Sequence, residues 1–162
     1  MAKTYHLERV QLIRRPREEV FAFFADAGNL EAITPDFLQF KILTPRPIEM
    51  RAGTLIDYRL KLAGVPFYWQ TRIETFDPPY SFSDLQVKGP YRRWHHWHEF
   101  YDVPQGTIAV DRVEYELPVG PLGRLARLLF VERNLEQIFE HRRQRLRELL
   151  PDIVPEPTAA NA

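Results

Sequence analysis

The sequence predicts an α+β fold, in which a curved antiparallel sheet of about seven strands is covered by two short helices and one long C-terminal helix. Three observations support this prediction. The middle of the chain alternates apolar and polar residues, short turns separate these segments, and one long amphipathic segment follows them. Hairpin connections make neighbouring strands antiparallel, and a long helix in the concavity of such a sheet buries both apolar faces. This arrangement need not be filled beneath the helix, so we expect it to enclose a cavity.

The first elements are expected to be a strand and two short helices. Residues 4–14 are rich in Tyr, Leu, Val and Ile, which is typical of a strand. Pro16 then opens a helix, because the missing N–H of proline would be unpaired in the first turn in any case. Gly28 and Asn29 end this helix, and a second short helix is expected over residues 30–33.

Six strands are expected to follow. Their predicted ranges are 37–43, 54–62, 67–76, 82–87, 91–103 and 107–117. The alternation is clearest in the second of them, where Ile56, Tyr58 and Leu60 share one face and Asp57 and Arg59 lie on the other. Prolines and glycines lie between the segments, as turn residues do.

A long helix is expected over roughly residues 124–150, followed by a tail. Its apolar stripe consists of Leu125, Leu128, Val131, Leu135, Ile138, Leu146 and Leu149. Arg142 lies on this stripe, where an apolar residue would be expected. One domain over residues 1–150 is therefore predicted. The prolines that follow Leu150 cannot continue a helix, which predicts a flexible tail over residues 151–162.

Composition excludes several classes of protein. The chain has 162 residues, 22 basic and 22 acidic side chains and no cysteine. This length suits one domain with a real core, and the lack of cysteine excludes disulfides, thiolate metal sites and cysteine nucleophiles. The balanced charge gives no basic surface for nucleic acid, and no apolar run reaches the roughly 18 residues of a membrane span. We expect a cytoplasmic protein without a nucleic-acid partner or stable membrane insertion.

Three segments resemble a known family. They are residues 16–30 (PREEVFAFFADAGNL), 89–100 (GPYRRWHHWHEF) and 111–123 (DRVEYELPVGPLG). In this order and spacing they resemble the SRPBCC superfamily of START-like proteins, and the last two resemble its bacterial polyketide cyclase/dehydrase-like branch. The resemblance implies the helix-grip fold up to about Leu150. Because the superfamily includes lipid carriers, polyketide binders, cyclases and oxygenase domains, the resemblance leaves the function open.

The most unusual stretch is residues 94–98 (WHHWH). On a strand, Trp94, His96, His98 and Phe100 share one face, so two imidazoles could bind one metal ion. The candidates for a third ligand are His6, His141, Asp111 and a glutamate. Because the sequence contains no second motif of spaced ligands, we expect neither a metal nor another cofactor and interpret the histidines as part of the cavity wall.

The same side chains could instead act in acid–base catalysis, since imidazole titrates near neutral pH. The catalytic candidates are His96, His98 and Tyr115, with Tyr58 and Arg142 as further polar groups. The sequence contains no nucleophile elbow, glycine-rich phosphate loop or paired-carboxylate motif. Binding is therefore favoured over catalysis.

Arg142 has two interpretations. A buried arginine needs a partner, because an unpaired buried charge is strongly unfavourable. The favoured partner is a carboxylate on the sheet, either Asp111 or Asp57. The alternative partner is the carboxylate or polar head of a ligand, which the planar guanidinium would suit.

The favoured function is the binding or transport of a small hydrophobic molecule, such as a lipid, a quinone or a polyketide-like compound, between the sheet and the long helix. The residues expected to contact it are Tyr58, Leu60, Trp69, Ile73, Trp94, His96, His98, Phe100, Val113, Tyr115, Leu135, Ile138 and Arg142.

Two alternatives stay open. One is a cyclase or dehydrase-type enzyme that uses the histidines and tyrosines of the cavity. The other is an accessory protein that acts through a partner interface. The apolar segment 120–130, which includes Leu129 and Phe130, could form a portal, a homodimer contact or a shallow membrane-docking element. Packing of the helix against neighbouring loops is the favoured interpretation of this segment.

Overall fold

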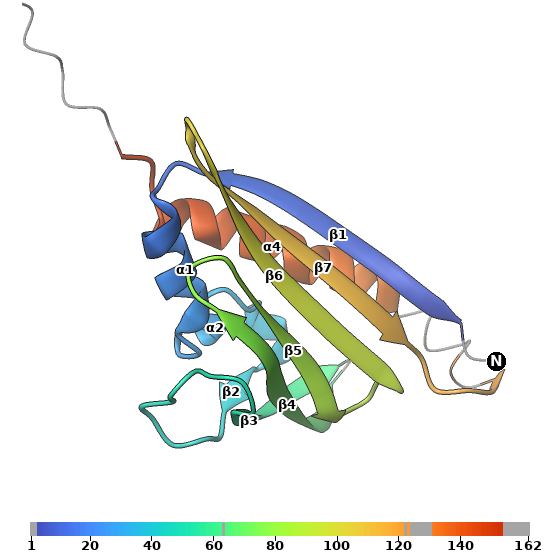
Figure 1. Cartoon of the computed structure of the whole chain (residues 1–162). Coiled ribbons are helices and arrows are strands. Elements are labelled where there is room, and N and C mark those ends of the chain that lie inside the picture. Colours follow the sequence, from blue (N-terminus) through green and yellow to red (C-terminus); the bar gives the residue numbers. More distant parts are fainter. Residues whose placement is uncertain (1–2, 63, 122, 124–130, 154–162) are drawn as a thin grey trace, which may run out of the picture.

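One antiparallel sheet forms most of the structure (Figure 1). The computed structural model describes residues 3–62, 64–121, 123 and 131–153. The strands are β1 (Thr4–Ile13), β2 (Lys41–Ile42), β3 (Leu55–Leu62), β4 (Val65–Asp77), β5 (Ser81–Lys88), β6 (Arg93–Val103) and β7 (Gly106–Glu116). They lie in the order β1-β7-β6-β5-β4-β3-β2, and every neighbouring pair is antiparallel.

The described helices lie at two places in the chain. Between β1 and β2 are α1 (Arg17–Ala25), α2 (Asn29–Ala32) and the 3-10 helix η1 (Asp36–Leu38), and after β7 is α4 (Glu132–Leu149). Figure 1 shows α4 crossing one face of the sheet behind β6 and β7, with α1 and α2 near its C-terminal end. The guanidinium of Arg145 donates to the carbonyl of Ala32 at 3.1 Å and so joins α4 to the end of α2. This arrangement confirms the predicted α+β fold.

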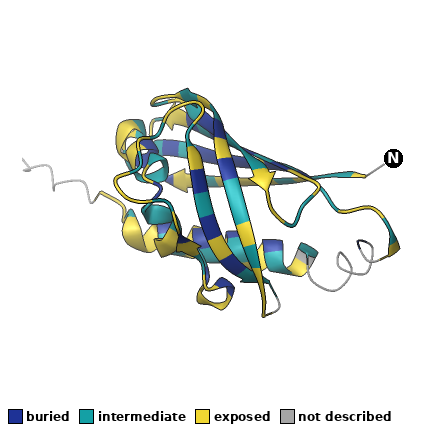
Figure 2. Ribbon diagram, turned by 90° about the horizontal axis from the view of Figure 1, so that it is seen from below, coloured by how far each residue is buried: buried dark blue, intermediate teal, exposed yellow. Residues whose placement is uncertain are grey.

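The alternation of buried and exposed residues confirms which faces of the strands point inward (Figure 2). On β3, Ile56, Tyr58 and Leu60 are buried and Arg59 is exposed. On β6, the buried positions begin at Trp94 and recur at every second residue as far as Phe100. Side chains of one parity therefore face α4, as the period of two predicts.

The sheet bends at β4. The pairing of β4 with β5 shifts register twice, between Gln70 and Thr71 and between Ile73 and Thr75. An extra residue on one strand of a pair bends that strand and increases its twist. These irregularities allow the sheet to curve around the space beneath α4.

The prediction of a strand over residues 37–43 was wrong for most of its length, because the strand found there, β2, has only two residues. Residues Asp36–Leu38 form η1, and only Lys41 and Ile42 pair with β3. Gln39 has φ of 44°, in the left-handed region that an extended strand cannot contain. The apolar character of this segment instead reflects burial of Leu38 and Ile42 against the sheet.

The described part of α4 confirms the predicted stripe at Leu135 and Leu146, and Val131 and Ile138 are partly buried. The prediction was wrong for Leu149, which is exposed at the last residue of the helix. The buried positions of α4 are Leu135, Phe139, Arg142 and Leu146, spaced by three or four residues, so the charged Arg142 does lie among apolar neighbours. Phe139 was not predicted. Residues 124–130, which include Leu125, Leu128, Leu129 and Phe130, lie outside the described residues.

The first residues after α4 run beside the end of β1. The carbonyl of Pro151 accepts a hydrogen bond from Arg15 at 2.7 Å, and the N–H of Ile153 donates to the carbonyl of Arg14 at 3.4 Å. Residues 154–162 lie outside the described part of the chain. The flexibility expected for residues 151–162 stays a prediction, and so does the domain boundary at residue 150.

The described residues form three core clusters. The first joins α1 to β5, β6 and β7 and includes Val20, Phe21 and Phe100. The second, which includes Ile56 and Ile73, packs on β3 and β4. The third joins α4 to β6 and β7 through Leu135, Phe139, Trp94, Val113 and Tyr115.

Phe100 and Tyr101 provide a matched test of this core, because they are neighbours on β6 with 2% and 48% of their surface exposed. Phe100→Ala should lower the free energy of unfolding by about 3–5 kcal/mol, since it removes a ring from the centre of the first cluster. Tyr101→Ala should lower it by about 1 kcal/mol or less. Denaturant unfolding measures both changes, provided that the dependence of the unfolding free energy on denaturant concentration (the m value) stays the same. Equal losses of unfolding free energy in the two variants would contradict this description of the core.

Candidate functional site

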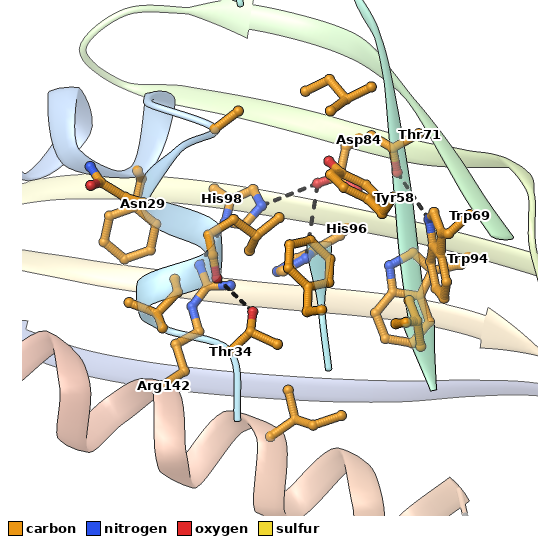
Figure 3. Close-up of a pocket in the computed structure, with 18 of the residues that line it drawn as sticks. Asn29, Thr34, Tyr58, Trp69, Thr71, Asp84, Trp94, His96, His98 and Arg142 are labelled. Atoms are coloured by element: carbon orange, nitrogen blue, oxygen red, sulfur yellow. Dashed lines mark hydrogen bonds and ion pairs between the residues drawn. The ribbon is translucent and has the colours of Figure 1, made fainter. Parts of the chain in front are cut away.

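A cavity of about 210 Å³ lies between the sheet and the helices. Its wall is mainly apolar and aromatic, and it draws on every core cluster: Phe82 from the first, Ile56 from the second and Trp94 from the third. Figure 3 shows Trp69 and Trp94 at one end of the wall and Asn29 and Arg142 at the other. The curved sheet and α4 therefore leave a cavity, and Asp84, His96 and His98 lie close together in its wall, between these two ends.

Most of the residues predicted to contact a ligand line this cavity. They are Tyr58, Leu60, Trp69, Ile73, Trp94, His96, His98, Leu135, Ile138 and Arg142. Three others do not line it. Phe100 packs in the first core cluster, and Val113 and Tyr115 pack in the third. Tyr115, one of the catalytic candidates, stacks on Tyr5 with ring centroids 5.3 Å apart. Contact between the lining residues and a ligand stays a prediction.

Five polar side chains form a buried cluster beside the cavity, which we call the Asp–His–Arg cluster. It consists of Asp84 on β5, His96 and His98 on β6, Asp111 on β7 and Arg142 on α4. Strand register explains how the sheet residues meet. Asp84 lies opposite His96 and Asp111 lies opposite His98, so all four side chains share the inner face.

Asp111 is the centre of this cluster. Its Oδ1 atom lies 2.9 Å from Nε2 of His96, 2.9 Å from Nδ1 of His98 and 3.3 Å from Nη2 of Arg142. Asp111 is therefore the partner of Arg142, and this confirms one of the two carboxylates predicted for that role. The other, Asp57, accepts hydrogen bonds from Tyr68 and Gln70 instead.

The two carboxylates stay ionised although they are buried. Burial raises the pKa of Asp111, but the charge of Arg142 and the hydrogen bonds from His96 and His98 outweigh it and hold this pKa well below its usual value. Burial also raises the pKa of Asp84, and the hydrogen bond from His98 together with the nearby positive charges lowers it overall.

The two imidazoles are perturbed in opposite directions. Burial lowers the pKa of His96, the neighbouring His98 lowers it further, and its bond to Asp111 does not make up the difference. Burial lowers the pKa of His98 as well, but hydrogen bonds to Asp111 and Asp84 outweigh this and raise it. The ring centroids lie 3.9 Å apart, so two imidazoles whose pKa values shift in opposite directions are neighbours in the cavity wall.

Asp84 is the functional candidate that the sequence prediction missed. Figure 3 shows it between His98 and His96, with Tyr58 beside it. Its Oδ2 atom lies 3.2 Å from Nε2 of His98 and 4.0 Å from Nδ1 of His96. The sequence does hold a signal for Asp84. It lies two positions after Phe82, and residues two apart on a strand share a face, so a charged side chain is expected among inward-facing apolar ones.

Two aromatic rings contact Arg142 in addition to Asp111. Its guanidinium lies 5.0 Å from the centre of the Phe24 ring and 6.0 Å from that of Phe139, so aromatic faces cover the charge. Its Nε atom is buried without a hydrogen-bond partner in the part of the chain that the structure describes. A donor of the guanidinium thus stays unused beside the cavity.

Comparison with known proteins identifies the family. The family described as polyketide cyclase/dehydrase and lipid transport matches residues 13–142. The chain belongs to this family. A comparison with curated proteins gives no match.

Solved structures of this shape come from several organisms. The protein TTHA0849 from Thermus thermophilus is 20% identical, with a TM-score of 0.66 over 91% of this chain and 99% of that chain. The ginseng major latex-like protein 151 from Panax ginseng is 12% identical, with a TM-score of 0.67 over 91% and 98%. A nucleoside-diphosphate sugar epimerase from Corynebacterium glutamicum is 24% identical, with a TM-score of 0.65 over 88% of this chain and 28% of that chain. At these identities the likeness shows the fold alone, and it confirms the helix-grip fold of this family member.

No helix among the described residues has both the length and the apolar character that crossing a bilayer requires. The cytoplasmic location expected for this family member stays a prediction.

The pair between Arg142 and Asp111 can be tested against an exposed pair. Arg142→Met should lower the free energy of unfolding by on the order of 3 kcal/mol, because it leaves the buried carboxylate of Asp111 without its cationic partner. The double variant R142M/D111N should recover most of this loss. Arg112→Met, which breaks exposed pairs with Glu8 and Glu99, should lower it by about 1 kcal/mol or less.

Chemical denaturation of the three variants measures these differences. If R142M and R112M lose equal stability, or if the double variant is no more stable than R142M, the buried pair does not have the role described.

Proposed function

We propose that this protein binds a small hydrophobic molecule in the cavity beneath α4 and acts as its carrier. The observation that supports this proposal is the cavity itself, an internal space of about 210 Å³ with a largely apolar and aromatic wall. Burial of apolar ligand surface there contributes roughly 25 cal/mol per Å², before the entropy of association is subtracted. Membership of a family described by polyketide chemistry and lipid transport supports a hydrophobic ligand in general.

The wall favours a ligand with one polar end. Asp84, His96, His98 and Arg142 line the cavity close to one another, and aromatic and aliphatic side chains make up most of the remaining wall. A few polar groups that converge in an apolar pocket orient a ligand and select its head group. A fatty acid, a quinone and a polyketide-like aromatic compound all carry an oxygen-bearing end on an apolar body, so these three classes are the proposed ligands.

A second candidate function is catalysis of the cyclase or dehydrase type. The observation that favours it is His98, whose imidazole lies between two carboxylates, 3.2 Å from Asp84 and 2.9 Å from Asp111. The pKa of His98 is raised and that of the neighbouring His96 is lowered, so the pair would offer an acid and a base to one ligand. Because Tyr115 does not line the cavity, the catalytic candidates narrow to the two histidines.

The third expectation, an accessory role through a partner interface, depended on Leu129 and Phe130. Both lie outside the described residues, so the partner interface and the homodimer stay predictions without a supporting observation.

The tryptophans allow binding to be located. Trp69 and Trp94 line the cavity, whereas Trp97 stacks on His95 on the opposite face of β6, with ring centroids 3.7 Å apart. Titration with oleate, menadione or emodin should change the tryptophan fluorescence saturably for at least one of the three. This change should persist in Trp97→Phe and disappear in the double variant W69F/W94F, which keeps only the outer indole.

A cavity-filling variant provides the matched control. Ala27 lines the cavity and Ala22 is an exposed residue of α1. Ala27→Leu should weaken binding of the same probe by at least about tenfold, because added methyl groups occupy ligand space in a packed interior. Ala22→Leu should leave it unchanged. Absence of binding by every probe, or equal effects of the two substitutions, would overturn the proposal.

A further inference from the structure

We propose that Asp84, His96 and His98 form a binding site for one divalent transition-metal ion, of the Zn²⁺ or Fe²⁺ class, in the wall of the cavity. The carboxylate of Asp84 and one ring nitrogen from each histidine lie within 4.8 Å of one another. Figure 3 shows the three side chains converging from β5 and β6. Two imidazoles and one carboxylate are a ligand set that these ions prefer.

The distances suit a common ion. Oδ2 of Asp84 lies 3.2 Å from Nε2 of His98 and 4.0 Å from Nδ1 of His96. Ligands that each lie about 2.1 Å from one tetrahedral ion are roughly 3.4 Å apart. The three ligand atoms all lie within 4.8 Å of one another, so they need to move closer together to surround a single metal ion.

Asp111 orients both imidazoles for this role. Nε2 of His96 and Nδ1 of His98 each lie 2.9 Å from Asp111, and Nη2 of Arg142 lies 3.5 Å from the same nitrogen of His98. An ionised carboxylate only accepts hydrogen bonds, so the closer contact with Asp111 favours a hydrogen on each of these two nitrogens. The opposite nitrogens, Nδ1 of His96 and Nε2 of His98, are those that face Asp84. Metal-bound histidines characteristically donate their other N–H to a carboxylate in this way, which fixes the orientation of the ring.

The charges of the cluster leave room for a cation. Arg142 lies 3.3 Å from Asp111 and balances its charge. Asp84, whose side chain is 17% exposed, forms ion pairs with the two imidazoles alone among the described residues. A largely buried carboxylate of this kind is stabilised by a cation, and a divalent ion would supply one while both imidazoles stay neutral.

The proposed ion would be open to the cavity. Asp84, His96 and His98 all belong to the cavity wall, and three protein ligands leave at least one coordination position free. A carbonyl, enolate or carboxylate oxygen of the bound molecule could take that position. This last point rests on the proposed function, whereas binding of the metal alone does not.

Titration of the chelator-treated full chain with Co²⁺ tests the site, because cobalt reports its coordination by visible absorption. One equivalent per chain should bind, with bands typical of mixed nitrogen and oxygen ligands, and Zn²⁺ should displace it. Asp84→Asn, His96→Gln and His98→Gln should each weaken binding by at least about 100-fold, beyond the range known for residues that only orient ligands. His95→Gln is the matched control, since His95 lies on the outer face of the same strand.

Several results would overturn the site: no saturable binding, binding that survives in H96Q/H98Q, or equal loss in H95Q. If a histidine variant does not fold, the test rests on D84N, which keeps the shape of the side chain. Metal binding by D84N as tight as that of the unmodified chain would then overturn the site. Oleate binding to the metal-free chain is measured separately. Retained oleate binding without metal binding overturns the metal site and leaves the carrier proposal standing.

Discussion

The burial of Arg142 on an otherwise apolar face of α4 is the constraint on which the rest of the structure depends. A guanidinium in this position is tolerated only opposite a carboxylate, and Asp111 on β7 lies 3.3 Å away. The same oxygen of Asp111 accepts hydrogen bonds from His96 and His98. One charge pair thus holds the helix against the sheet and sets the direction of both imidazoles.

The cavity follows from the shape of the sheet. Register shifts between β4 and β5 bend the strands, and α4 spans the concavity without filling it. The three core clusters pack around the hollow and supply its apolar walls. Larger side chains in these clusters would fill the cavity, so tighter packing of the core would leave less room for a ligand.

The predictions from sequence succeeded where one physical pattern dominates. Alternation with a period of two located the strands and their inner faces, including His96 and His98, because burial of one face imposes that period. The predictions failed where contacts between distant residues determine the local structure or the role of a side chain. The stretch before β2 looked like a strand, yet the left-handed Gln39 and the burial of Leu38 made most of it irregular. Asp84 was missed because its importance depends on the strand paired with it, which no local pattern reveals.

By itself, the sequence determined the class of fold, the inner faces of the strands and the place of an arginine in the helix stripe, because these depend on local periodicity and on the requirement to bury apolar surface. Tertiary structure alone decided which side chains meet. Strand register placed Asp84 opposite His96 and Asp111 opposite His98, and the position of α4 brought Arg142 to them. Contacts between residues far apart in the chain depend on the path of the whole backbone, and so the cluster and the cavity appear only in the folded protein.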